Sequence, residues 1–103
     1  MKILLLGSGG REHALAWKMA QSSQLEKLYV APGNAGTAEI AENIALDVND
    51  FKAIGDFTIQ HDVDLLVVGP EQPLVDGIHD YFSSQPRLAN ITVIGPTKEG
   101  AQL

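Results

Sequence analysis

Four short apolar runs, each stopped by glycine or proline, constrain the fold more than any other feature of the sequence. They read ILLLGSGG (3–10), LYVAPGN (28–34), LLVVGPE (65–71) and ITVIGPT (91–97). Their hydrophobicity is continuous rather than alternating, which is typical of strands buried on both faces. Glycine and proline then turn the chain into loops. The pattern predicts a parallel sheet covered by helices on both sides.

The segments between these runs are long enough for crossover helices. Helices are predicted over 10–22, over about 50–60 with Asp50 near its start, and over about 73–83. NIALDV (43–48) predicts a weaker fifth strand. Alternating strands and helices favour a Rossmann-like, doubly wound α/β domain with right-handed crossovers. Such sheets bind ligands beyond the carboxyl ends of their strands.

The first predicted helix should bury one stripe of its surface. Trp17 lies at the edge of that stripe and is predicted to be partly buried core. The apolar stripe consists of Leu15, Ala16, Met19 and Ala20.

At the other end of the chain, GPTKEGAQL predicts the start of a further helix, capped by Thr97.

Length and charge narrow the functional classes. With 103 residues, 45% of them hydrophobic, the chain is predicted to form a single globular domain over 1–103. A formal net charge of −6 opposes binding to a nucleic-acid backbone. No apolar run approaches the roughly 18 residues of a membrane span, so a cytoplasmic protein is expected. The absence of cysteine excludes thiolate metal sites.

The loop GSGG after the first strand partly fits a dinucleotide-binding fingerprint. Gly7 and Gly9 occupy its first two positions, but the third, which should be glycine, is Glu12. A carboxylate there would fill the place where helix and strand pack closely. The second strand ends in VAPGN, without the acidic residue that holds an adenosine ribose. Both departures point away from a nicotinamide dinucleotide, and the P-loop pattern is also missing.

A site for a single phosphate remains compatible with this loop. The main-chain N–H groups of Gly9, Gly10 and Arg11 would lie at the positive end of a helix dipole, and Ser8 could add its hydroxyl. The competing interpretation is that Gly7 to Gly10 form only a tight turn from strand to helix.

Four segments taken together carry a resemblance to a known family. GSGGREHALAWK, VAPGNAGTA, VVGPEQPLVDGI and IGPTKEGAQL, in this order over nearly the whole chain, resemble the amino-terminal domain of the glycinamide ribonucleotide synthetases, also called phosphoribosylamine–glycine ligases. In that family, ATP activates glycine as an acyl phosphate, and the amine of 5-phosphoribosylamine attacks it during purine biosynthesis.

The resemblance also implies that different domains of the family's enzymes bind different substrates. The segment is the family's pre-ATP-grasp domain, and ATP, magnesium and glycine bind to ATP-grasp domains that have no counterpart in these 103 residues. It therefore implies that this chain holds 5-phosphoribosylamine, binds neither ATP nor magnesium, supplies no catalytic residue or metal ligand, and is inactive in ligation without its ATP-grasp domains.

Three further residues are candidates for substrate contacts under this resemblance. Gly33 and Asn34 end the second strand, where Asn34 could bond a ribose hydroxyl or phosphate, or could simply form a turn. Glu71 could accept hydrogen bonds from ribose hydroxyls or the substrate amine, or could merely favour a helix start. Two alternatives for the whole chain stay open: a nicotinamide-dinucleotide module and a non-catalytic interaction domain.

Overall fold

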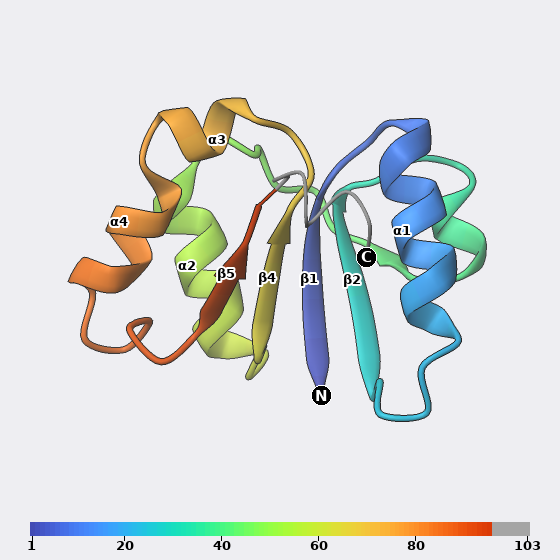
Figure 1. The fold of residues 1–103 in the computed structure, drawn as a ribbon, viewed down its shortest axis with the longest axis horizontal. Helices are drawn as coiled ribbons and strands as arrows, with labels where there is room; N and C mark the ends of the chain where they lie inside the picture. The colour runs from blue at the N-terminus through green and yellow to red at the C-terminus, as the bar shows by residue number, and fades with distance from the viewer. Residues whose placement is uncertain (96–103) are drawn as a thin grey trace.

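Five parallel strands form one sheet at the centre of the molecule (Figure 1). The computed structural model describes residues 1–95, so the helix start predicted at Thr97 lies outside the described residues. The strand order is β3-β2-β1-β4-β5, and every neighbouring pair is parallel, which confirms the predicted doubly wound architecture. The strands are β1 (Lys2–Gly7), β2 (Lys27–Pro32), β3 (Glu42–Asn43), β4 (Leu65–Val68) and β5 (Thr92–Ile94).

Helices cover both faces of this sheet. Along β1, Ile3 and Leu5 face the side of α1, whereas Leu4 and Leu6 face the side of α2 and α4. Because alternate residues of a strand point to opposite faces, a strand buried on both sides must be apolar throughout. The helices are α1 (Gly10–Ala20), the 3₁₀ helix η1 (Thr37–Glu39), α2 (Phe51–Gln60), α3 (Gln72–Val75) and α4 (Ile78–Ser84).

Helix α1 confirms only part of its predicted apolar stripe. Ala16 is fully buried, and Leu15 and Met19 pack against the same core cluster, but Ala20 is exposed. The prediction for Trp17 is wrong, since its side chain is 59% exposed. Successive residues of a helix are separated by about 100°, so the residue after the buried Ala16 points away from the sheet.

The helix predicted over 73–83 is two helices. The chain leaves α3 through Asp76 and Gly77, and Gly77 takes a left-handed conformation with φ of 94°. A helix cannot continue through a left-handed residue, and glycine adopts that conformation with little strain. The short α3 therefore lies over the end of β4, while α4 packs its buried Ile78 and Phe82 into the core.

The strand predicted over 43–48 is also shorter than expected. Only Glu42 and Asn43 pair with β2, and the chain then turns through an N–H···O bond from Leu46 to Ile44. Asn43 donates its side-chain amide to the main-chain oxygen of Asn34, which fixes the end of β3 against the neighbouring loop. The Ile44 N–H still donates to the Val30 carbonyl at 2.8 Å, and residues 45–48 then leave the sheet and pass along its carboxyl edge.

Asp50 lies at the start of helix α2, as predicted, and the structure shows that its side chain caps the helix. Its carboxylate accepts the main-chain N–H of Ala53 at 3.1 Å. We expect Asp50→Ala to lower the free energy of unfolding by about 1 kcal/mol, because that N–H loses its partner. Urea denaturation measures the change. Asp50→Asn keeps an acceptor and serves as the control, and equal losses in both variants would contradict a capping role.

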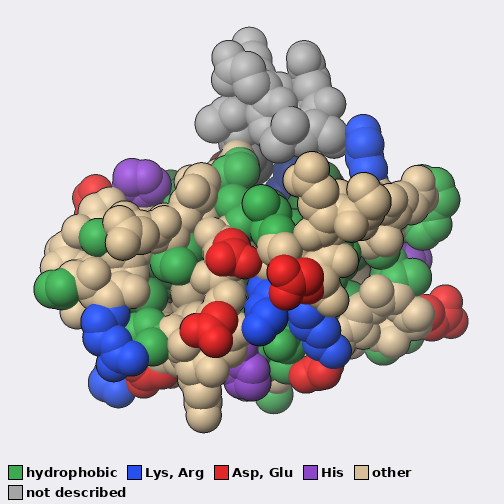
Figure 2. Space-filling view, turned by 90° about the horizontal axis from the view of Figure 1, so that it is seen from below, with side chains coloured by type: hydrophobic (Ala, Val, Ile, Leu, Met, Phe, Trp, Pro, Cys, Tyr) green, Lys and Arg blue, Asp and Glu red, His purple; other side chains and the backbone are tan. Residues whose placement is uncertain are grey.

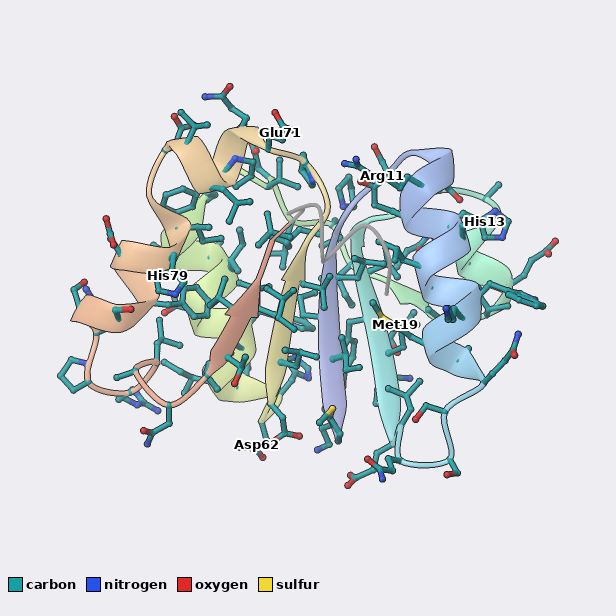
Figure 3. All side chains as sticks on the ribbon, viewed as in Figure 1. Arg11, His13, Met19, Asp62, Glu71 and His79 are labelled. Atoms are coloured by element: carbon teal, nitrogen blue, oxygen red, sulfur yellow. The ribbon has the colours of Figure 1, made fainter. Side chains whose placement is uncertain are left out.

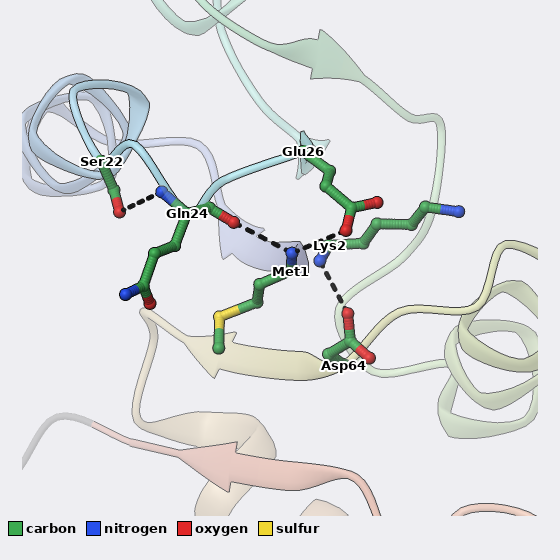
Figure 4. A network of polar contacts seen from close by, with 6 residues as sticks. All are labelled: Met1, Lys2, Ser22, Gln24, Glu26 and Asp64. Atoms are coloured by element: carbon green, nitrogen blue, oxygen red, sulfur yellow. Dashed lines mark hydrogen bonds and ion pairs between the residues drawn. The ribbon is translucent and has the colours of Figure 1, made fainter.

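The amino ends of the strands are tied together by polar contacts (Figure 4). The Met1 ammonium contacts the Gln24 carbonyl at 2.9 Å and the Glu26 carboxylate at 3.1 Å, and the Lys2 N–H donates to Asp64 at 2.8 Å. Figure 2 looks onto this end, where acidic and basic side chains lie side by side.

None of the helices in residues 1–95 has the length and apolar character that crossing a membrane requires.

Candidate functional site

The loops that follow β1, β2 and β4 meet at the carboxyl edge of the sheet. The Gly33 N–H donates to the Gly7 carbonyl at 2.9 Å, and the Gly69 N–H donates to the Leu6 carbonyl at 3.0 Å. Gly7 and Gly33 have φ angles of 138° and 77°, which side chains rarely tolerate. Glycine at these two positions lets the loops after β1, β2 and β4 meet closely, and together these three loops form the rim of the sheet's carboxyl edge.

Asn34 is bonded to the protein's own groups in this rim. Its Nδ2 donates to the carbonyls of Ser8 at 2.8 Å and Gly9 at 3.2 Å, and its Oδ1 accepts the Thr37 N–H at 2.9 Å. A side-chain amide has two hydrogens to donate, and both are used here. Asn34 therefore holds the glycine loop against the end of β2, whereas the predicted contact with a ligand stays a prediction.

Glu12 occupies the position where a dinucleotide fingerprint has its third glycine. Its side chain is only 6% exposed and runs between Gly7 and Gly69, where a Cβ on either glycine would collide with it. Its Oε2 accepts the Gly9 N–H at 3.0 Å, as in the helix-capping arrangement of a glutamate at the third helical position. The predicted close fit is confirmed, but the Gly9 N–H is not free for an anion.

Three other main-chain nitrogens of the loop remain open. Among residues 1–95, the N–H groups of Ser8, Gly10 and Arg11 have no hydrogen-bond acceptor in the protein. Those of Gly10 and Arg11 belong to the first turn of α1, where the helix dipole favours an anion. The rim thus retains N–H donors that a phosphate could use, and Gly10 and Arg11 lie at the start of the first helix, where the sequence predicts them.

Arg11 and Glu71 bring opposite charges to this edge (Figure 3). The Arg11 Nη2 donates to the Gly69 carbonyl at 2.6 Å, which keeps the guanidinium at the rim between α1 and the end of β4. Glu71 is exposed and precedes α3, but its side chain does not cap that helix. Its carboxylate is therefore available at the rim, and its role in binding stays a prediction.

A pocket of about 480 Å³ opens at this edge, beside the glycine loop. One wall of this pocket, residues 46–48, is not among the residues that the sequence predicts for the site, because NIALDV (43–48) predicts a strand. The only available signal was the Asp47–Asn49 segment, whose Asx turn places the Asn49 N–H on Asp47 Oδ1 at 2.9 Å. The lining residues are Gly7, Ser8, Gly9, Glu12, Pro32, Leu46, Asp47, Val48 and Pro70.

A second hollow, of about 350 Å³, lies on the outer side of α1. It is lined by Gly10, His13, Ala14 and the exposed Trp17. The His13 ring packs against Gly36, where a Cβ would meet it. Gly10 thus borders this hollow, whereas Ser8 and Gly9 border the larger pocket, and the open end of α1 lies between the two.

Comparison with known sequences gives one consistent result. The family model described as "Phosphoribosylglycinamide synthetase, N domain" matches residues 1–103. The phosphoribosylamine–glycine ligases of Pseudomonas putida and Escherichia coli K12 are 54% and 51% identical to the chain over its whole length. The chain spans only 23% and 24% of these two relatives, about a quarter of their length.

Solved structures agree on the architecture. A crystal structure of phosphoribosylamine–glycine ligase from Thermotoga maritima matches 96% of the chain, with a TM-score of 0.54 and 28% identity, and the match covers 20% of that protein. Saccharopine dehydrogenase from Saccharomyces cerevisiae matches 91% of the chain with a TM-score of 0.64. Its identity is 21%, and it shares the fold alone.

Proposed function

The chain belongs to the phosphoribosylglycinamide synthetase N-domain family, and on that premise we propose that it binds 5-phosphoribosylamine by the phosphate group. The observation that carries the proposal is the open start of α1. The N–H groups of Gly10 and Arg11 have no acceptor within residues 1–95, and the Arg11 guanidinium is held at the same edge by the Gly69 carbonyl. Main-chain donors at a helix start, together with one cation, suit a phosphate.

The proposed site needs local donors because the whole chain repels anions. The formal net charge is −6, so long-range attraction does not assist a phosphate. The N–H of Ser8 adds a third open donor at the border of the larger pocket. Gly33 and Asn34 support the site by fixing the loop, and Glu71 is proposed to accept a hydrogen bond from the ribose or the amine.

The remaining steps of the reaction belong to the rest of the full-length enzyme in this proposal. ATP, magnesium and glycine bind to ATP-grasp domains outside these 103 residues, in the cytoplasm, where phosphoribosylamine and glycine are joined with ATP hydrolysis. The N domain brings the sugar phosphate to that active site and is inactive in ligation on its own.

Ribose 5-phosphate tests the proposal in the isolated chain. We expect millimolar ribose 5-phosphate to shift the backbone amide NMR signals of residues 8–11, because a phosphate placed there accepts hydrogen bonds from open N–H groups. The signals of α4, on the far side of the sheet, provide the internal control. NADH is added in a parallel titration. Unchanged signals at residues 8–11 with ribose 5-phosphate would refute phosphate binding, and NADH binding at these residues would favour a dinucleotide module instead.

A further inference from the structure

The environment of Glu12 is unusual for a carboxylate. The side chain is 94% buried at the sheet edge, yet within residues 1–95 it forms no ion pair, and its one hydrogen bond comes from the Gly9 N–H. Burying a charged group is unfavourable unless hydrogen bonds replace its hydration. One N–H and the helix start compensate only part of that loss, and the second carboxylate oxygen has no donor among the described residues.

That second oxygen, Oε1, is not sealed inside the protein. No buried side-chain oxygen in residues 1–95 lacks a hydrogen-bond partner, and Oε1 has none, so it cannot be sealed in the core. Glu12 lines the pocket of about 480 Å³, and its Oε1 lies next to Gly69, the residue before the lining Pro70. A donor group on a molecule in this pocket can therefore reach a carboxylate oxygen that the protein leaves open.

The charges of the rim are divided between its two sides. Glu12 and Asp47 both line the pocket, but Asp47 is exposed and its carboxylate already accepts the Asn49 N–H, so Glu12 is the carboxylate with an open oxygen there. The open N–H groups of Gly10 and Arg11 lie at the start of α1, and Gly10 borders the other hollow. A phosphate placed beside a carboxylate is repelled, whereas hydroxyl and amine groups donate to it.

From this division we infer that Glu12 orients the substrate. This inference rests on the proposed function and adds the orientation in which the sugar phosphate binds. Glu12 Oε1 accepts a hydrogen bond from a hydroxyl or amine of the sugar, so the sugar enters the pocket, while the phosphate stays at its lip near Gly10 and Arg11. Glu12 is thus a specificity residue that favours a sugar phosphate over a bare phosphate.

The variant Glu12→Gln isolates this role. Glutamine at the third helical position can still accept the Gly9 N–H, so the cap is preserved, but the charge is lost. NMR titrations with ribose 5-phosphate and with inorganic phosphate give two dissociation constants for each variant. We expect the preference for ribose 5-phosphate over inorganic phosphate to fall about tenfold or more, because a hydrogen bond to a charged group is lost. Phosphate affinity itself is expected to be retained.

Asp47→Asn is the matched control. Asp47 lines the same pocket, but it is exposed and already accepts the Asn49 N–H. Its substitution is expected to leave the preference unchanged. If Glu12→Gln keeps the full preference, or if both variants lose it equally, the inference is wrong while the proposed function stands. If neither ligand shifts the signals of residues 8–11 in the unsubstituted chain, the proposed function itself fails.

The unsubstituted chain offers a second test that does not depend on any variant folding. With bound ribose 5-phosphate, nuclear Overhauser effects are expected between the sugar protons and the methyl groups of Leu46 and Val48, which line the pocket. Contacts of the sugar with Ala14 and Trp17 instead would place it in the hollow on α1 and would overturn the inferred orientation.

Discussion

Gly7→Ala is expected to lower the free energy of unfolding by about 2–5 kcal/mol, since backbone strain and overpacking act together. Gly7 has a φ of 138°, which an alanine adopts only with strain. A Cβ at this position would also collide with the Glu12 side chain, which could move aside only by giving up its bond to the Gly9 N–H. The variant must therefore distort either the end of β1 or the cap of α1.

Urea denaturation of Gly7→Ala, compared with a second variant in the same loop, tests this expectation. Gly10→Ala is the matched control, because a Cβ at Gly10 has no protein atom within 4 Å. That control is expected to be unchanged, or up to about 1 kcal/mol more stable, since alanine favours a helix. If Gly7→Ala unfolds at the same urea concentration as the natural chain, the close fit between Gly7 and Glu12 is not what shapes the rim.

The strands were predictable because their signal is local. A strand buried on both faces has to be apolar along its whole length, so β1, β2 and β4 stand out as continuous runs. The break between α3 and α4 depends on one residue, Gly77, whose left-handed conformation is visible only in the structure. The helical spacing of apolar residues continues across this break, and the sequence therefore predicts one helix over 73–83.

The site was predictable only in part, because its key bonds join residues that are far apart in the sequence. The glycine loop itself is a local signal, and it lies where the sequence predicts. The bond from Asn34 to the Ser8 carbonyl spans 26 residues, and the bond from Arg11 to the Gly69 carbonyl spans 58. No spacing rule connects such positions, so neither the fixing role of Asn34 nor the pocket wall at Asp47 could be predicted.

Gly10→Pro is expected to weaken ribose 5-phosphate binding about 10- to 100-fold, the effect of losing one hydrogen bond to a charged group. Proline lacks the N–H that this proposal assigns to the phosphate, but its ring suits the first position of a helix. The preceding Gly9 already has φ of −89° and ψ of 178°, the extended conformation that proline requires before it. The substitution therefore removes a single donor while the rim keeps its shape.

Two comparisons separate the loss of that donor from a change in structure. Gly10→Ala retains the N–H and adds a Cβ in open space, so it should bind ribose 5-phosphate as the natural chain does. The proline variant should unfold within about 1 kcal/mol of the natural chain, as expected for a residue favoured at this position. If a fully folded Gly10→Pro binds ribose 5-phosphate with undiminished affinity, the phosphate does not sit on the start of α1, since no other group at residue 10 could replace the missing hydrogen.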